Sequence, residues 1–263
     1  LASEALNGLG VPTTRSLAVI GIRELIYRQR PELAAILVRV ADSHIRFGSF
    51  EFFHYNGQGK NVERLLEFSI QSYYPDIVEE SDKYRIFFQR TVQRTAKLIA
   101  KWQAVGFIHG VMNTDNMCIT GTTFDYGPYG FMDRFVPKYT SNHSDTHGRY
   151  AYSQQPEIGF WNLNKLAETL TPLIGAEILE EEMKQYQPTF NQFYREEMSK
   201  KLGLSILDSE FSQLVQEMFQ LLHNQQLDYT NFFRFLANYP AASSSDDDLK
   251  SWLSRYLELA QRE

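Results

Sequence analysis

The chain has 263 residues, and its 26 Lys and Arg against 32 Asp and Glu give a formal net charge of −6 at pH 7. A net-acidic chain without a basic run is a poor nucleic-acid binder, because phosphate neutralisation dominates that affinity. Its longest purely apolar run, residues 33–38, is far shorter than the ~20 residues of a membrane helix. The single cysteine, Cys118, excludes an internal disulfide and a Cys-rich zinc site, and we expect a reducing, cytoplasmic location.

The first predicted elements are a short helix and three strands. Residues 1–9 have the pattern of the last turns of a helix, stopped by Gly8 and Gly10. Segments 16–20, 24–28 and 33–41 are rich in β-branched or apolar residues and are predicted strands, joined by turns at Gly21 and around Arg30-Pro31. An aromatic stretch, 47–55, follows. Because the sequence starts without Met and in a helical pattern, we expect it to be a piece of a longer protein.

A helical period dominates the rest of the chain. Asn61 is a predicted N-cap, and Asp82 precedes a long helix that ends at Gly106. Residues 107–159 have no helical period and are rich in Gly, Asn, Asp and His. Further helices are predicted at 160–172, 174–187, 189–202, 208–223, 226–238 and 246–262. This order predicts an α+β fold, and an irregular segment of this length inside a compact body is usually functional.

The centre of the irregular segment is predicted to be a β-hairpin. Residues 117–119 and 122–124 flank Thr120-Gly121, which is a turn signal. Folding the chain about this tip places Asn116 opposite Asp125, because both lie equally far from it. An amide oxygen and a carboxylate then converge at the open end of the hairpin. Such hard oxygen ligands suit Mg²⁺, which takes one or two protein oxygens together with phosphate and water.

Asp115 need not join this metal site. Adjacent residues point in different directions, so Asp115 can face the substrate as a base or an orienting group. His109-Gly110 before the loop and Asp125-Tyr126-Gly127 after it resemble two protein-kinase motifs. In protein kinases, however, the catalytic Asp precedes the metal-binding Asn by about five residues, which disfavours an ordinary kinase here. The alternative is a loop whose Asp and Asn side chains only cap turns.

Two arginines form a second signal. Arg39 interrupts the apolar strand 33–41, which we expect to be buried, and Arg46 lies shortly after it. A buried guanidinium needs a partner, and phosphate matches its planar fork of donors. The alternative for either arginine is a structural pair with a carboxylate.

Two further motifs favour structural roles. His143 and His147 are spaced as zinc ligands on a helix would be, but Gly148 and the lack of a third ligand favour a loop. Cys118 has no basic neighbour in the sequence, so we expect packing and not nucleophilic chemistry.

The longest motifs resemble one known family. Residues 109–117 (HGVMNTDNM) and 125–131 (DYGPYGF) resemble selenoprotein O, the bacterial YdiU-type protein adenylyltransferases. Four further stretches are also similar to it: 9–15, 39–48, 142–145 with 148–150, and 155–157 with 161–163. The resemblance covers essentially the whole chain and is densest over 9–170.

The resemblance implies a protein-kinase-like fold, in which 1–58 are the remnant of an N-lobe with a few strands and 59–263 are a mainly helical C-lobe. It also implies transfer of AMP from ATP to Ser, Thr or Tyr hydroxyls of proteins, with Mg²⁺ and with Mn²⁺ as an alternative. By position, Asp115 matches the proton acceptor of the family. Asn116 and Asp125 match its metal ligands, and Asp125 also contacts the nucleotide. Arg39 and Arg46 match its phosphate-binding arginines.

Parts of the family pattern lie outside this sequence. The Gly-rich loop, the nucleotide-binding Lys and the Glu of helix αC would precede Leu1, and a C-terminal region would follow Glu263. We therefore expect the chain alone to bind ATP poorly and to have little activity. Two alternative functions stay open: a phosphotransferase of kinase-like fold, similar to aminoglycoside kinases, and a non-catalytic pseudokinase scaffold.

Overall fold

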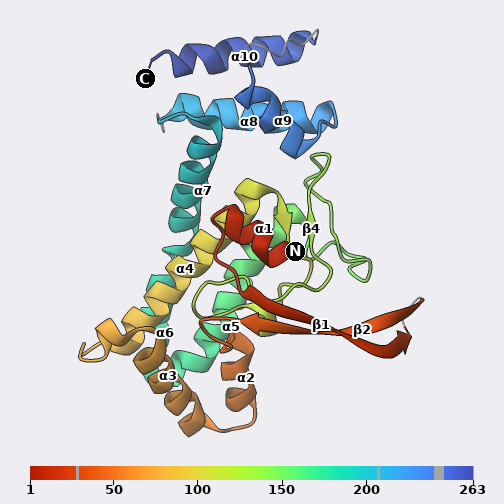
Figure 1. The fold of residues 1–263 in the computed structure, drawn as a ribbon. Coiled ribbons are helices and arrows are strands. Elements are labelled where there is room, and N and C mark those ends of the chain that lie inside the picture. The colour runs from red at the N-terminus through yellow and green to blue at the C-terminus, as the bar shows by residue number, and fades with distance from the viewer. Residues whose placement is uncertain (28–29, 206–207, 240–245, 263) are drawn as a thin grey trace.

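The computed structural model describes residues 1–27, 30–205, 208–239 and 246–262. It has the expected α+β fold, in which a two-stranded ribbon extends from a mainly helical body (Figure 1). The helices are α1 (Ala2–Gly8), α2 (Phe47–Tyr55), α3 (Gly59–Tyr73), α4 (Lys83–Val105), α5 (Gln155–Ile174), α6 (Ala176–Met183), α7 (Tyr186–Leu202), α8 (Ser209–Asn224), α9 (Tyr229–Ala237) and α10 (Asp247–Ala260). The strands are β1 (Arg15–Tyr27), β2 (Pro31–Val40), β3 (Phe107–Ile108) and β4 (Gly130–Phe131).

Strands β1 and β2 pair in antiparallel fashion to form the ribbon. The predicted strands 16–20 and 24–28 are one continuous strand, so the turn predicted at Gly21 is wrong. The register of the pair shifts between Gly21 and Leu25, where the chain forms a bulge. An antiparallel pair tolerates such a bulge without ending the ladder. Arg28, at the end of the second predicted strand, lies outside the described residues, and β2 begins at Pro31.

Much of the ribbon is exposed, because two strands alone cannot bury both of their faces. The expectation that Arg39 interrupts a buried strand is therefore wrong, and Arg39 itself is half-buried. The large apolar side chains exposed on the two strands are Leu17, Val19, Ile20, Leu25, Ile26, Tyr27, Leu33, Ile36, Leu37 and Val40.

Helix α4 is the centre of the helical body and packs on α5 and α7. It begins after Asp82 and ends at Gly106, as the sequence predicts. Gly106 has a φ of 69°, a left-handed conformation that terminates helices and favours glycine. The members of its predicted apolar face are all buried: Phe88, Val92, Thr95, Ile99 and Trp102.

Several helix boundaries differ from the prediction for local reasons. Helix α3 begins at Gly59, so Asn61 lies in its first turn and donates to the side chain of Gln58 instead of capping. Helix α5 begins at Gln155, ahead of the predicted residue 160. Helix α7 contains Pro188 in its first turn, where a missing N–H needs no intrahelical partner.

Helices α8, α9 and α10 form a layer at the far end of α7 (Figure 1). Each begins after an Asp whose carboxylate accepts a backbone N–H in the first turn, which is a stabilising N-cap. The pairs are Asp208 with Phe211, Asp228 with Asn231 and Asp246 with Leu249. The helix predicted over 208–223 is thus capped by Asp208. Among the described residues, no helix combines the length and the apolar character needed to cross a bilayer.

Gly159 lies where α5 crosses α4, and a substitution at this position tests how tightly the core is packed. A Cβ at this position would lie 2.1 Å from Cδ1 of Ile99 and 2.6 Å from the hydroxyl oxygen of Tyr186. We expect Gly159→Ala to lower the free energy of unfolding by about 1–3 kcal/mol, as overpacking does in other cores. Urea denaturation measures this change. Gly59→Ala, which meets no atom within 4 Å in the first turn of α3, is the control and should not destabilise.

Lys201, in the last turn of α7, is an amine held among apolar groups. Its Nζ donates to the carbonyl oxygen of Ala104 at 2.6 Å, at the end of α4. The same atom lies 4.1 Å from the ring centroid of Tyr229 and 4.0 Å from that of Phe233, both on α9. Burial lowers the pKa of Lys201 to about 7, because the charged form loses its hydration. The aromatic faces act in the opposite direction, since they attract a cation.

This low pKa predicts a pH-dependent stability. An unfolded lysine has a pKa near ~10.4, so between pH 7 and pH 10 the unfolded chain binds more protons than the native one and stability rises with pH. We expect the unfolding free energy of the wild type to rise by about 3 kcal/mol more than that of Lys201→Met over this range. Urea titrations at each pH measure both. Lys200→Met, which removes an exposed neighbour, should follow the wild type. Parallel curves for the wild type and Lys201→Met would contradict the assignment.

Candidate nucleotide and metal site

The irregular segment after α4 is held at both ends by strand pairing. Phe107 pairs with Phe131 and Ile108 with Gly130, which closes the segment between β3 and β4 into one large loop. Inside this loop, a 3-10 turn at Thr114–Asn116 contacts α2 and α5. The loop therefore lies between the start of α2 and the helical body, and it carries three of the predicted site residues.

The two predicted phosphate-binding arginines converge on Phe124. Nη1 of Arg39 donates to the carbonyl oxygen of Phe124 at 2.5 Å. The guanidinium carbons of Arg39 and Arg46 lie 5.6 Å and 5.5 Å from the centroid of the Phe124 ring. Asp125 is the next residue in the chain. The fold thus brings two cations from β2 and from the start of α2 to the residue that precedes the predicted metal ligand.

Neither arginine has the structural carboxylate partner that the sequence left open. Within the described ranges, no salt bridge involves Arg39 or Arg46. Nε of Arg46 is buried and has no hydrogen-bond partner there. A buried guanidinium N–H without an acceptor is costly. An anion with several oxygens, such as a polyphosphate, fits this donor set.

Asp115 lies against the start of α2. A Cβ on Gly48 would lie 2.2 Å from Oδ1 of Asp115 and 2.9 Å from its Cγ, so the carboxylate occupies the space that any side chain at position 48 would need. Gly48 is two residues after Arg46, which is the N-cap residue of α2. Asp115 is exposed, as a group that meets a substrate must be. Sequence reasoning missed Gly48, because only this contact between distant segments distinguishes it from other glycines.

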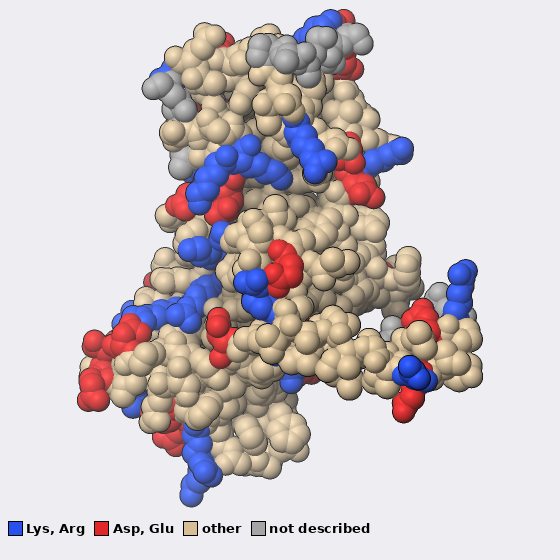
Figure 2. Space-filling model, in the orientation of Figure 1, with Lys and Arg blue, Asp and Glu red and all other residues tan. Residues whose placement is uncertain are grey.

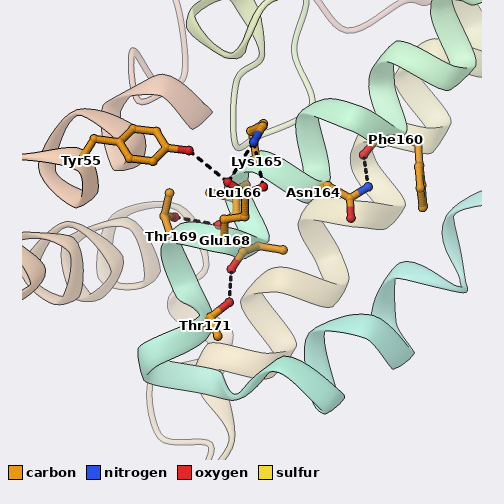
Figure 3. Close-up of polar contacts among 9 residues, drawn as sticks. Tyr55, Phe160, Asn164, Lys165, Leu166, Glu168, Thr169 and Thr171 are labelled. Carbon is orange, nitrogen blue, oxygen red and sulfur yellow. Dashed lines mark hydrogen bonds and ion pairs between the residues drawn. The ribbon is translucent and has the colours of Figure 1, made fainter.

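Helix α2 is tied to the body at its other end. The Tyr55 hydroxyl donates to Oε2 of Glu168 on α5 at 3.0 Å, and Lys165 donates to the same carboxylate at 2.8 Å and 3.0 Å (Figure 3). These contacts are exposed and contribute little to stability. Together with the packing of α2 on α5, they fix the direction in which α2 presents Arg46 and Gly48.

The side-chain amide of Asn116 is oriented by its own loop. Its Nδ2 donates to the carbonyl oxygen of Val111 at 2.8 Å and to Oδ1 of Asn113 at 3.0 Å. Both amide hydrogens are therefore used, and the amide oxygen is the atom left to bind a cation. This is the orientation that a metal ligand requires, and Asn113 is a supporting residue that the sequence did not single out.

Asp125 and His109 form the inner part of the site. Oδ1 of Asp125 accepts the backbone N–H of Tyr126 at 2.9 Å, which orients the carboxylate. Burial of His109 lowers its pKa to about 4, and the negative charge of Asp125 acts in the opposite direction. The imidazole is therefore neutral near pH 7. Its Nδ1 accepts the backbone N–H of Val111, so the ring supports the loop that carries the acidic residues.

The hairpin of residues 117–124 differs from the prediction by one residue of register. Met117 pairs with Thr123, whereas folding about Thr120-Gly121 pairs Met117 with Phe124. The neighbouring residues pair with other segments instead: Cys118 with Arg46, and Thr123 also with Thr13. The symmetric folding used to place Asn116 opposite Asp125 is therefore wrong in detail. That these two side chains share one metal ion stays a prediction.

The remaining candidates have structural roles. The carboxylate of Asp145 accepts the backbone N–H groups of Arg149 and Tyr150, so the segment that holds His143 and His147 is a loop. Among the described residues, no group of three or more His, Cys, Asp and Glu side chains is placed to hold a metal. Cys118 is buried, and burial raises the pKa of its thiol, so it packs and is not activated.

A short ribbon beside a helical body, with an acidic loop and two arginines where they meet, is consistent with the kinase-like class of α+β proteins. The chain belongs to the family described as protein adenylyltransferase SelO, whose model matches residues 1–261. It is 44% identical over 267 aligned positions to the protein nucleotidyltransferase YdiU of Myxococcus xanthus (strain DK1622). The alignment covers 97% of this chain and 55% of that relative, so the chain spans about half of the relative's length. The resemblance found in the sequence is thereby confirmed.

Proposed function

We propose that this chain forms the catalytic body of a protein adenylyltransferase, which transfers AMP from ATP to Ser, Thr or Tyr hydroxyls of proteins. The observation that carries the proposal is the convergence of Arg39 and Arg46, both without a carboxylate partner in the described part of the chain, beside Asp125. Membership of the SelO family and the similarity to the Myxococcus protein nucleotidyltransferase support nucleotidyl transfer. We place the activity in the cytoplasm, in keeping with the free, buried Cys118.

Each residue of the proposed site has a role that follows from its side-chain chemistry. Asn116 and Asp125 would hold Mg²⁺, or Mn²⁺ as an alternative, through one amide and one carboxylate oxygen. When bound, such an ion neutralises charge on the phosphate oxygens of ATP. Arg39 and Arg46 bind the outer phosphates, which makes pyrophosphate the leaving group.

Asp115 acts on the acceptor hydroxyl. The bond from the hydroxyl oxygen to the α-phosphorus forms, the bond from that phosphorus to the bridging oxygen breaks, and pyrophosphate leaves. The hydroxyl proton passes to the carboxylate of Asp115, which its exposed position beside α2 allows. Most of the rate gain comes from positioning and electrostatics, as in other phosphoryl-type transfers.

Isotope position separates this proposal from the phosphotransferase alternative. Full-length protein is incubated with a protein acceptor and ATP labelled with ³²P at either the α or the γ position. AMP transfer labels the acceptor from α-labelled ATP only. Labelling from the γ position would establish a kinase instead. If neither form of labelled ATP labels the acceptor although the protein still binds its partner proteins, the pseudokinase scaffold would be favoured.

A further inference from the structure

A cavity of about 550 Å³ lies apart from the nucleotide site, between the end of α1, the end of α4, α7 and α9. Apolar side chains form much of its lining, and Lys201 is the amine within it. Charged side chains of α7 and α9 lie around it: Glu197, Lys200 and Arg234. Figure 2 shows basic and acidic side chains gathered on the face between the α8–α9 layer and the middle of the molecule.

The environment of Lys201 is that of a reactive amine. Within the described residues it forms no salt bridge, and its Nζ has one hydrogen-bond partner there, the carbonyl oxygen of Ala104. The neighbouring carboxylate, Glu197, is paired with Lys101 and Lys200 instead. Tyr229 is neutral, because burial raises the pKa of its phenol well above 10. A large fraction of Lys201 is therefore the free base near pH 7.

We propose that Lys201 is a site of Nε-acylation, and that this cavity admits the acyl group of a small acyl thioester. The lone pair of Nζ attacks the thioester carbonyl carbon, the C–N bond forms, and the C–S bond breaks. The thiolate leaves and takes up, through water, the proton that the nitrogen loses. No oxidant, reductant or metal is needed. The proposal does not depend on the nucleotide-transfer function.

The product explains why an acyl donor fits better than an aldehyde. An acylated Lys201 is a neutral amide that keeps one N–H to donate to the carbonyl oxygen of Ala104. Its acyl group lies among apolar side chains, where a charge would be costly. An aldehyde would instead give a protonated imine, and its positive charge would be costly among the apolar side chains of the cavity. Lys200 and Arg234 at the edge suit a thioester carrier that bears phosphate groups.

Lys200 is the matched control on the same helix. It precedes Lys201 in the chain, its side chain is 68% exposed, and it pairs with Glu197 at 3.0 Å. Reagent reaches it freely, but its amine is held in an ion pair. Accessibility alone therefore predicts faster acylation of Lys200, whereas the cavity predicts faster acylation of Lys201.

The test uses the full chain and N,S-diacetylcysteamine, a small neutral acetyl thioester. Acetylation of Lys201 and Lys200 is quantified in the same molecules by peptide mass spectrometry at pH 6 to 9. We expect Lys201 to react about tenfold faster or more than Lys200 at pH 7.5. Its lower basicity makes the free amine a weaker nucleophile, but its larger fraction of free amine outweighs that loss. Its rate should level off above pH 7.5. Equal or slower labelling of Lys201 would overturn the proposal.

The second arm of the test repeats the acetylation measurement on the unfolded chain. In 8 M urea the cavity is gone, so both lysines should react at similar rates. If Lys201 still reacts faster when unfolded, its reactivity belongs to the local sequence and the cavity proposal is wrong. Both arms use the wild-type chain, so no variant has to fold for the result to count.

Discussion

Replacing Asp125 by Ala is expected to reduce AMP transfer by the full-length protein about 10³-fold or more, because under the proposed function it removes the carboxylate that would hold the metal and contact the nucleotide. Asp125 follows Phe124, on which both arginines converge, so its carboxylate lies where a phosphate-bound cation would be held. Transfer of ³²P from α-labelled ATP to a protein acceptor measures the effect.

Asp133→Ala is the matched control for this experiment. Asp133 is an exposed carboxylate just beyond β4, outside the cluster of Phe124 and the two arginines, and only its backbone carbonyl is engaged, with Tyr229. We expect the control to keep wild-type labelling. If Asp125→Ala keeps it as well, the metal assignment fails and the pseudokinase scaffold becomes the better account.

Replacing Gly48 by Ala should reduce transfer about 10²-fold without unfolding the protein, since a shift of about 1 Å in a catalytic group can cost that much. The new Cβ would overlap the carboxylate of Asp115, which has to turn away. The backbone of Gly48 is helical, so alanine there carries no conformational strain. Its Cβ would also lie 2.9 Å from Cγ and 3.3 Å from the backbone nitrogen of Asp115, so we expect no gain in stability to accompany the loss of activity.

The measurement pairs kinetics with thermal unfolding. Gly59→Ala has the same chemistry in a helical first turn but no atom near its new methyl group, and it should keep full activity. Loss of activity in Gly48→Ala with an unchanged KM for ATP would support a role of Asp115 toward the acceptor. Full activity of Gly48→Ala would show that the position of Asp115 does not matter, and its assignment as proton acceptor would be withdrawn.

The helices were predictable because the signals that form them are local. A cap at Asp208, a left-handed glycine at Gly106 and apolar residues at helical spacing act within a few residues of each other. The same is true of the irregular segment, whose lack of periodicity is visible directly. The long motifs around His109 and Asp125 identified the family without any structure, and the family comparison confirms this.

The strands were less predictable, because pairing joins residues that are far apart in the chain. Gly21 has the composition of a turn but lies in a bulge, since β2 provides a partner along the whole of β1. The one-residue shift between Met117 and Thr123 has the same origin: Cys118 pairs with Arg46, and Thr123 also pairs with Thr13. Competition between alternative pairing segments decides the register of a strand, and the sequence of one segment does not show which partner it will pair with.

The sequence by itself determined the helical body and the family, and it predicted a set of residues to bind phosphate and metal, because residue type and short-range spacing carry that information. Only the tertiary structure decided that Arg39 and Arg46 meet at Phe124, that Asp115 fills the space above Gly48, and that a lysine of α7 faces a cavity. Each of these depends on contacts between distant segments. Such contacts follow from how the whole chain packs, and no local pattern specifies them.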